Sequence, residues 1–159
     1  MIHPTAEIEE GATVHETAQV WHYAHIRKGA TIGANTVIGR GVFIDKGVSI
    51  GKNCKVQNYS CVYHGAEVFD GVFIGPRVII TNDKHPKAIN EDGTIKSEDD
   101  WICGKVWIRD GASLGAGAIV LPDVDVGAGA MIGAGAVVSK SVEKGVYVGI
   151  PAKNINITE

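Results

Sequence analysis

The chain has 159 residues, 21 of them glycine, and a formal net charge of −3. The length favours one domain spanning residues 1–159, and the slightly acidic balance argues against binding to nucleic acid. We expect no signal peptide and no membrane span, because a repeat begins at Ile2 and no apolar run reaches membrane-spanning length. Three cysteines without a Cys/His zinc spacing favour reduced thiols in a cytoplasmic protein, and we expect no metal site.

A branched aliphatic residue occupies every sixth position of the first half of the chain, from Ile2 to Ile80. Four residues after most of these positions comes a small or β-branched residue, as at Ala24 and Val42. Six is neither the helical nor the strand period. Hexapeptide repeats are typical of parallel β-helices, in which each short strand ends in a turn and three strands complete one coil. The predicted fold class is therefore all-β, a parallel β-helix of hexapeptide repeats.

Residues eighteen positions apart lie directly above one another in such a coil, with strands stacked about 4.8 Å apart. One column is then a ladder of branched apolar side chains that fills the interior: Ile8, Ile26, Ile44, Val62 and Ile80. Three residues further on, a second column holds Gly11, Gly29, Gly47, Gly65 and then Asp83. Glycine supplies the positive φ of a tight corner without steric cost. The same corner is therefore expected in four consecutive coils, and the regular winding is expected to leave the helix at Asp83.

The frame breaks beyond Ile80, where the next three hexad positions hold proline, aspartate and glutamate. We predict a loop over residues 82–105 that is extruded from one corner, with a turn at Asp92-Gly93. A loop of this length inside a compact repeat is usually functional. Trp101 and Ile102 within it need burial, and we expect a neighbouring chain to cover them.

The hexads then resume in a shifted frame. The interior positions of this second run are Ile108, Leu114, Val120, Val126, Ile132 and Val138. Two identical Gly-Ala-Gly-Ala pieces, residues 115–118 and 133–136, lie eighteen positions apart and are expected to stack. Side chains this short are expected to leave backbone N–H and C=O groups open to a ligand. The pattern lapses after Lys144, so residues 146–159 are expected to form a short C-terminal extension.

Several motifs are much more specific than the hexads. They are Ile2-His3-Pro4-Thr5-Ala6, Val20-Trp21-His22, Lys55-Val56-Gln57-Asn58, Gly75-Pro76, Thr81-Asn82-Asp83-Lys84-His85-Pro86 and the closing Val148-Gly149-Ile150-Pro151-Ala152-Lys153. With its hexads and loop, the whole chain resembles the left-handed β-helix acyltransferases, and within that group it is similar to the N-acetyltransferases that act on nucleotide-linked 3-amino sugars. The left-handed winding is implied by this resemblance, because right-handed crossovers are the general rule.

The resemblance implies transfer of an acetyl group from acetyl-CoA to the amine of a nucleotide-linked sugar, in a homotrimer with active sites between subunits. It also implies that Asn82 holds the sugar amine. The chemistry requires an amine that is unprotonated and positioned, and a stabilised oxyanion. A side-chain base is useful but not required, since a primary amine with a pKa of roughly 8 is partly neutral at cellular pH.

Two histidines are candidates for that base. His64 stands two residues after Val62, and Asn82 two after Ile80, so the two share an outward column one coil apart. The alternative for His64 is a solvated corner position, since lysines occupy the same column in the coils before it. His85 belongs to an Asn-Asp-Lys-His-Pro run and is otherwise an ordinary loop histidine. The base is therefore His64, His85 or no side chain, a choice that the sequence leaves open.

The remaining candidates are contacts to the two substrates. Gln57, Asn58 and Lys87 are candidate substrate-binding residues, the lysine for the phosphates of the nucleotide. The plain alternatives are a structural asparagine in a turn and a solvated loop lysine. The candidates for acetyl-CoA are Gly115, Ala118, Gly133 and Ala136, whose backbone would line the pantetheine arm, and Lys153, near the adenosine-side phosphates. The alternative for the Gly-Ala pieces is simply tight turns.

Three other functions use the same kind of fold. O-acetylation of a sugar or serine hydroxyl is the nearest, and it needs a strong general base because a hydroxyl is a far weaker nucleophile than an amine. A carbonic anhydrase needs three histidines around zinc, two of them closely spaced, and the six histidines of this chain contain no suitable pair. A non-catalytic scaffold is disfavoured by the long loop and the Thr81-Asn82 motif.

Overall fold

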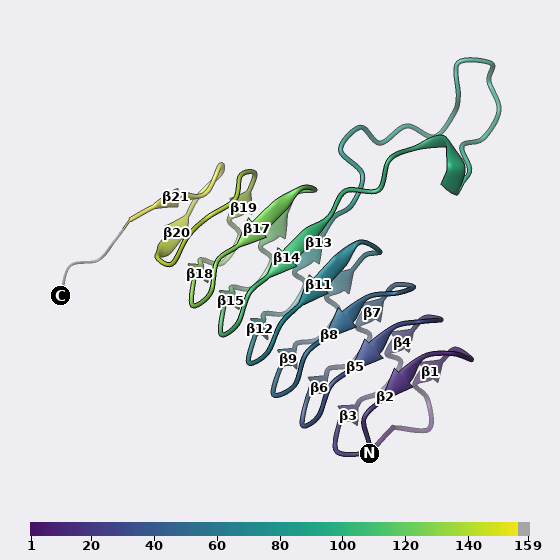
Figure 1. The fold of residues 1–159 in the computed structure, drawn as a ribbon, viewed down its shortest axis with the longest axis vertical. Helices are drawn as coiled ribbons and strands as arrows, with labels where there is room; N and C mark the ends of the chain where they lie inside the picture. Colours follow the sequence, from purple (N-terminus) through teal and green to yellow (C-terminus); the bar gives the residue numbers. More distant parts are fainter. Residues whose placement is uncertain (156–159) are drawn as a thin grey trace.

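A computed structural model describes residues 1–155. The chain winds into a prism with three sheet faces, each coil adding one short strand to each face (Figure 1). The first face contains β1 (Glu7–Ile8), β4 (His25–Ile26), β7 (Phe43–Ile44), β10 (Cys61–Val62), β13 (Ile79–Ile80), β16 (Ile119–Val120) and β19 (Val137–Val138). The second face contains β2 (Thr13–Val14), β5 (Thr31–Ile32), β8 (Ser49–Ile50), β11 (Ala66–Val68), β14 (Val106–Ile108) and β17 (Val124–Val126). The third face contains β3 (Gln19–Val20), β6 (Val37–Ile38), β9 (Lys55–Val56), β12 (Phe73–Ile74), β15 (Ser113–Leu114), β18 (Met131–Ile132), β20 (Val146–Val148) and β21 (Lys153–Asn154).

The predicted all-β fold class is confirmed, and the architecture is consistent with the left-handed winding that the resemblance implies. All strand pairs on the three faces are parallel except the last, β20 with β21. The helical content of the described residues is one 3-10 turn, η1 (Glu98–Asp100). Within residues 1–155 we find no helix with the length and apolar character needed to cross a bilayer.

The predicted interior column is confirmed by the strand register. Ile26 pairs with Ile44, and Val62 pairs with both Ile44 and Ile80. These four side chains are completely buried. Ile2, in contrast, keeps 47% of its surface exposed. Each interior residue is covered by its equivalents in the coils before and after it, and Ile2 has a coil on one side alone.

The predicted corner between the first and second faces is also confirmed. Its residues Gly11, Gly29, Gly47 and Gly65 all have positive φ, between 67° and 92°. Backbone in this region suits glycine, because a Cβ would be strained there. After β13 the chain no longer makes this turn. It leaves the helix, and Val68 pairs with Ile108, 40 positions along the chain, whereas Val62 pairs with Ile80 at 18.

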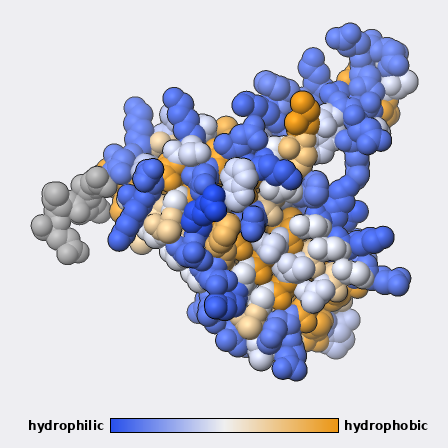
Figure 2. Space-filling view, in the orientation of Figure 1, coloured by the Kyte–Doolittle hydropathy of each residue, from blue (hydrophilic) through white to orange (hydrophobic). Residues whose placement is uncertain are grey.

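The extruded segment projects from the body of the prism (Figure 1). Its tip is a small hairpin in which Ile89 and Ile95 form an antiparallel bridge and Gly93, at the predicted turn, has a φ of 84°. Figure 2 shows mostly hydrophilic residues over the loop, with apolar residues visible on the body of the helix. Trp101 is half-buried, whereas Ile102 is 90% exposed, so the loop of one chain does not cover it.

The C-terminal end differs in part from the expectation for residues 146–159. Although the hexad pattern lapses after Lys144, β20 continues the third face by pairing in parallel with β18, Met131 opposite Val146. That coil is shorter by three residues than a full coil, which is why the sequence loses the frame while the sheet continues. β21 then folds back antiparallel to β20. The last four residues of the expected extension, 156–159, lie outside the described residues.

Candidate active site

The loop leaves the prism at the corner between the first and second faces, and we call this the loop corner (residues 63–65, 81–83, 103–105 and 121–123). His64 and Asn82 lie there in adjacent coils, which confirms the shared column. The amide Nδ2 of Asn82 donates to the carbonyl oxygen of His64 at 3.1 Å. The amide therefore contacts the backbone of His64 rather than its imidazole. The same amide also interacts with the thiol of Cys103, and its oxygen remains for another partner.

The imidazole of His64 is fixed by the coil below it. Its Nδ1 lies 2.8 Å from the carbonyl oxygen of Lys46. A carbonyl oxygen can only accept, so Nδ1 carries the proton, and in the neutral ring Nε2 is the nitrogen with a free lone pair. The ring is half-buried at the molecular surface. This is the tautomer that a general base requires, with the reactive nitrogen directed away from its anchor.

A carboxylate beneath His64 holds the backbone on which the imidazole stands. Asp45 is 8% exposed, and its Oδ2 accepts a hydrogen bond from the backbone N–H of His64 at 3.1 Å. Its Oδ1 accepts from the N–H of Lys46 at 2.7 Å and from Nη1 of Arg27 at 2.9 Å. Arg27 also donates to Glu9, one coil lower, at 3.3 Å. Sequence reasoning missed Asp45. The pattern that indicates it is a column of alternating charges eighteen positions apart, Glu9, Arg27 and Asp45.

The two ends of the loop are tied together at this corner. The N–H of Gly104 donates to the carbonyl oxygen of Asn82 at 2.7 Å, and that of Val106 donates to Gly65 at 3.2 Å. The thiol of Cys103 lies 3.3 Å from the carbonyl oxygen of His64. Burial raises the pKa of this thiol, so it stays protonated and is unsuited to act as a thiolate nucleophile. Within residues 1–155 no group of three His, Cys, Asp or Glu side chains is arranged to hold a metal ion.

The loop also contacts the prism one coil below His64. Glu98 in η1 forms an ion pair with Lys46, whose carbonyl oxygen anchors the imidazole. The hydrogen bond from Lys46 lowers the pKa of the Glu98 carboxyl. The extruded segment is thus attached at its base and again near its middle, on either side of the His64 coil.

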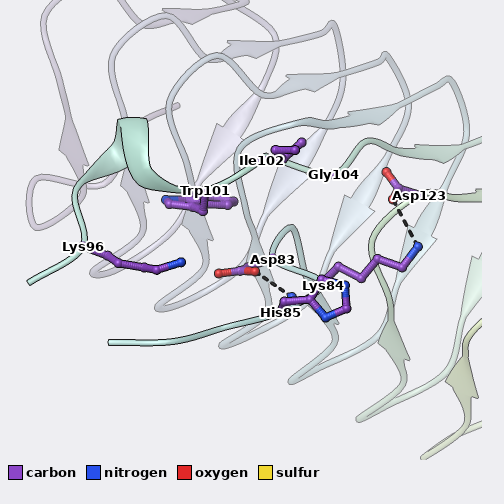
Figure 3. A pocket seen from close by; sticks show the side chains of 8 residues that line it. All are labelled: Asp83, Lys84, His85, Lys96, Trp101, Ile102, Gly104 and Asp123. Atoms are coloured by element: carbon purple, nitrogen blue, oxygen red, sulfur yellow. Dashed lines mark hydrogen bonds and ion pairs between the residues drawn. The ribbon is translucent and has the colours of Figure 1, made fainter. Parts of the chain in front are cut away.

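Two hollows flank the base of the loop, and each contains one of the candidate histidines. The loop hollow, with a volume of about 380 Å³, is lined by Asp83, Lys84, His85, Lys96, Trp101, Ile102, Gly104 and Asp123. Figure 3 shows Trp101 and Ile102 on one side of it and Lys84 and His85 on the other. The histidine hollow, with a volume of about 330 Å³, is lined by Gly47, Ser49, His64, Gly65, Ala66, Glu67, Lys105 and Trp107. The structure therefore separates His64 from His85.

His85 is less firmly held than His64. It is exposed, and the carboxylate of Asp83 accepts a hydrogen bond from its backbone N–H at 2.8 Å. This bond fixes the chain and leaves the ring free to rotate. His64 is thus the better-oriented of the two candidate bases.

The other candidate substrate-binding residues lie elsewhere. Gln57 and Asn58 stand at the corner that follows the third face, in a hollow shared with Trp21, His22 and Arg40. The side-chain oxygen of Asn58 accepts a hydrogen bond from the N–H of Arg40 at 2.9 Å, which is the turn role named as its alternative. Lys87 is exposed on the outgoing arm of the loop, outside both hollows that flank its base. Lys153 is exposed on β21.

The stacked Gly-Ala pieces form the upper part of that same corner, which we call the glycine–alanine corner (residues 57–59, 75–77, 115–117 and 133–135). Stacking is confirmed by a hydrogen bond of 2.8 Å from the N–H of Gly135 to the carbonyl oxygen of Ala116. The expectation of open backbone N–H groups is wrong for all four glycines, because each donates to a carbonyl oxygen of a neighbouring coil: Gly115 to Ile132, Gly117 to Pro76, Gly133 to Tyr147 and Gly135 to Ala116. Ala118 and Ala136 are fully buried in the core. The exposed turn alanines, Ala116 and Ala134, differ from the glycines, because their backbone N–H groups donate to no other residue within residues 1–155 and stay open to a ligand.

Sequence reasoning also missed three residues of the histidine hollow, Glu67, Lys105 and Trp107. Trp107 precedes the interior Ile108, which marks it as outward-facing. Its neighbour across the loop is Glu67, 40 positions earlier. This pairing depends on how many residues the loop removes from the coil, and the hexad pattern does not contain that number.

Comparison with known proteins agrees with this architecture. The model of the bacterial transferase hexapeptide family, six repeats, matches residues 11–46 and 105–140. The two matched stretches are the two runs of hexads, before and after the extruded loop. A search of the curated proteins finds no match to the sequence.

Several solved structures share the fold. An aspartate-to-alanine variant of AntD, an N-acyltransferase from Bacillus cereus in complex with dTDP and coenzyme A, has a TM-score of 0.70 and 24% identity, over 96% of this chain and 80% of that one. The UDP-N-acetylglucosamine O-acyltransferase LpxA from Moraxella catarrhalis has a TM-score of 0.65 and 19% identity, over 96% of this chain and 73% of that one. A hexapeptide transferase family protein from Anaplasma phagocytophilum has a TM-score of 0.54 and 22% identity, over 97% of this chain and 80% of that one. At these identities the likeness establishes the fold, a β-helix built from hexapeptide repeats.

Proposed function

We propose that this protein is an acetyl-CoA-dependent N-acetyltransferase that acts on the amine of a nucleotide-linked amino sugar. The observation that carries the proposal is the loop corner. There the Nε2 of His64 is left as an acceptor by the anchoring of Nδ1, and Asn82 lies in the adjacent coil. Both stand at the base of a long loop flanked by two hollows.

The reaction assigns a role to each group. The acceptor amine is held by Asn82, its lone pair attacks the thioester carbonyl carbon, and a C–N bond forms. His64 accepts the proton that the nitrogen loses. The tetrahedral intermediate collapses, the C–S bond breaks, and the CoA thiolate leaves and takes up a proton. His85 is the alternative base if the acceptor occupies the loop hollow, and with no side-chain base the amine enters already neutral.

The similar solved structures support the choice of substrates. The Bacillus cereus N-acyltransferase was solved with dTDP and coenzyme A, and another variant of it with dTDP-4-amino-4,6-dideoxyglucose and coenzyme A, at a TM-score of 0.61. Acetyl-CoA as donor and a nucleotide-linked amino sugar as acceptor fit the same fold here. The proposed reaction uses small-molecule substrates and would take place in the cytoplasm.

The proposal includes a homotrimer with the active site between subunits. The outward side chains of the first face form an apolar column of Phe43, Cys61, Ile79, Ile119 and Val137, of which Ile79 is 37% exposed. Such a column, like the exposed Ile102, is typical of a surface that a partner covers. The candidate acetyl-CoA residues lie at the glycine–alanine corner of one chain and His64 at its loop corner, so a second copy is needed to bring the two sets together.

Within that assembly the other candidates would contact substrates. Gln57 and Asn58 would bind the acceptor from the glycine–alanine corner, and Lys87 would pair with its phosphates. The exposed surface over the turns that contain Gly115 and Gly133 would lie along pantetheine. Lys153 would approach the adenosine-side phosphates.

An acceptor screen tests the proposed function directly. Acetyl-CoA is incubated with a panel of nucleotide-linked amino sugars, and release of free thiol is measured against matched hydroxyl acceptors. Turnover with amines alone supports N-acetylation. Turnover with hydroxyl acceptors would favour the alternative function, O-acetylation. The Moraxella O-acyltransferase has a similar fold, so the fold is compatible with that reaction. Sedimentation tests the trimer, and a stable, active monomer would contradict it.

A further inference from the structure

The floor of the histidine hollow is built from three consecutive coils of the second face. Glu67 pairs with Ser49 on one side and with Trp107 on the other, so their outward side chains stand side by side. His64 and Lys105, both at the loop corner, form the wall. The hollow thus contains an imidazole, a carboxylate, an ammonium group and an indole, all within reach of one small molecule.

The indole ring of Trp107 is held in place by Arg109. The guanidinium of Arg109 lies 5.7 Å from the centroid of the Trp107 ring and 4.8 Å from that of Phe69. Asp125 fixes this guanidinium with a hydrogen bond from Nε at 2.8 Å and another from Nη2 at 2.6 Å. The indole is therefore a preorganised surface, which lowers the entropic cost of binding a ligand against it.

The two charged side chains of the hollow, Glu67 and Lys105, lack the salt bridges that neighbouring charged side chains form. Lys46, Lys84 and Arg109 each have a carboxylate partner. Neither Glu67 nor Lys105 forms a salt bridge with any residue in the part of the chain that the structure describes, and both are exposed. A carboxylate and an ammonium group without salt-bridge partners complement a ligand that carries hydrogen-bond donors at one end and a phosphate at the other.

We propose that the histidine hollow is the binding site for the sugar of the acceptor and for the phosphate next to it, an inference that rests on the proposed function. The sugar ring lies against Trp107, Glu67 accepts hydrogen bonds from its hydroxyls, and Lys105 pairs with the first phosphate. This orientation brings the amine to the Nε2 of His64. The base then belongs to this hollow, and the loop hollow with His85 is left for another ligand.

Steady-state kinetics with purified variants of the full chain test the assignment. Trp107→Ala should raise the KM for the acceptor roughly tenfold, because the sugar would lose the aromatic surface against which its apolar face packs, and should leave the KM for acetyl-CoA unchanged. Trp107→Phe should recover part of the loss. Phe73→Ala removes an exposed aromatic ring from the third face and should change neither constant. If Trp101→Ala raises the acceptor KM instead, the acceptor occupies the loop hollow and the proposal is overturned.

The charge at Lys105 gives a second test with its own control. Lys105→Met should raise the KM for a nucleotide-linked amino sugar several-fold, yet leave the KM for the same amino sugar without phosphate unchanged. Equal effects on both acceptors would contradict the pairing with phosphate. Glu67→Gln should raise the KM for both acceptors by the same factor.

A binding measurement separates this inference from the proposed function. In a Trp21→Phe, Trp101→Phe double variant, Trp107 is the remaining tryptophan. A nucleotide-linked amino sugar should quench its fluorescence, and UDP or dTDP alone should quench it less. If the acceptor screen detects no transfer but quenching occurs, the proposed N-acetyltransferase function is wrong and the proposed sugar-binding site is supported. If transfer occurs and the fluorescence of Trp107 does not change, the proposed sugar-binding site is wrong and the proposed function is supported.

Discussion

The loop corner and the glycine–alanine corner are built on the same interior and differ in what they leave unused. In the two Gly-Ala pieces of the glycine–alanine corner, the N–H groups of all four glycines are bonded to neighbouring coils, and the closing alanines, Ala118 and Ala136, are buried. At the loop corner the half-buried imidazole of His64 keeps its Nε2 free and the amide of Asn82 keeps its oxygen. Lys105 at this corner and Glu67 on the adjoining second face lack salt-bridge partners within residues 1–155.

The difference follows from where the winding is interrupted. A regular coil places its backbone groups opposite those of its neighbours and pairs most of them. Where the chain leaves for 22 residues, the side chains at the point of departure stand beside a loop instead of another corner. The regular corner can therefore contact a ligand through its shape and the backbone of its turn alanines, whereas the interrupted corner also has polar side chains that can react with or bind the ligand.

Both corners depend on one apolar interior, and breaking it should have the largest effect. Ile44→Asp or Val62→Asp should lower the free energy of unfolding by several kcal/mol, because an unpaired charge would be buried at a fully covered position. Urea denaturation followed by circular dichroism measures this. Lys55→Asp, at an exposed position on β9, is the control and should cost less than about 0.5 kcal/mol. Variants at Ile44 and Val62 that unfold like the parent would mean that the column is assigned wrongly.

The chemistry assigned to the loop corner is tested by removing its two central side chains. Asn82→Ala should lose most of kcat/KM, because it removes a hydrogen bond that positions the acceptor amine. His64→Ala should lower kcat by roughly 10²- to 10⁴-fold, and raising the pH should restore part of the rate as the amine deprotonates unaided. The measurement is a pH profile of kcat for both variants and the parent.

His85→Ala is the comparison that sharpens this result. If it shows the pH-dependent loss while His64→Ala is nearly silent, the base lies in the loop hollow. If both histidine variants keep full activity with an unchanged profile, the amine enters already neutral and neither imidazole is a base.

The glycine–alanine corner is tested by changing shape alone. Ala116→Leu at an exposed turn should raise the KM for acetyl-CoA about tenfold, because the added side chain would displace the pantetheine arm from the surface. The chain offers a matched control, since residues 127–130 repeat the Gly-Ala-Gly-Ala sequence at the corner that follows the second face. Ala128→Leu, also exposed, should leave both KM values unchanged. Equal effects at the two positions would show that this corner has no special role.

The smallest effect is expected in the first coils, after β3, where His22 stacks on His3 with ring centroids 3.5 Å apart. Burial, and then the positive charges of His3 and Arg40, lower the pKa of His22 from its usual 6.5. The unfolded chain therefore binds a proton that the folded chain resists, and stability falls as the pH drops below about 6.5. The melting temperature of the parent should decrease from about pH 7.5 to about pH 5, and that of His22→Gln should decrease less. A parallel decrease in both proteins would assign the effect to other groups.

The sequence by itself determined the coil. Its period of six, its interior column and its four corner glycines were readable because each coil repeats the same steric demand on the same residue types. The stacking of Asn82 on His64 followed from the same arithmetic, since the two are counted from Ile80 and Val62 in one unbroken frame. The point of departure near Asp83 was readable for a related reason, as the first corner position without glycine.

The tertiary structure alone decided what lies across the interruption. The pairing of Glu67 with Trp107, and hence the histidine hollow, depends on how many residues the loop withdraws from the coil. The open N–H groups expected at the Gly-Ala pieces were wrong at the four glycines, because these groups donate to neighbouring coils whose backbone a local pattern does not describe. The tautomer of His64 is set by the carbonyl oxygen of Lys46, 18 positions earlier. A repeat in sequence fixes which residues are stacked, but the hydrogen bonds between stacked coils fix which of their polar groups remain free to act.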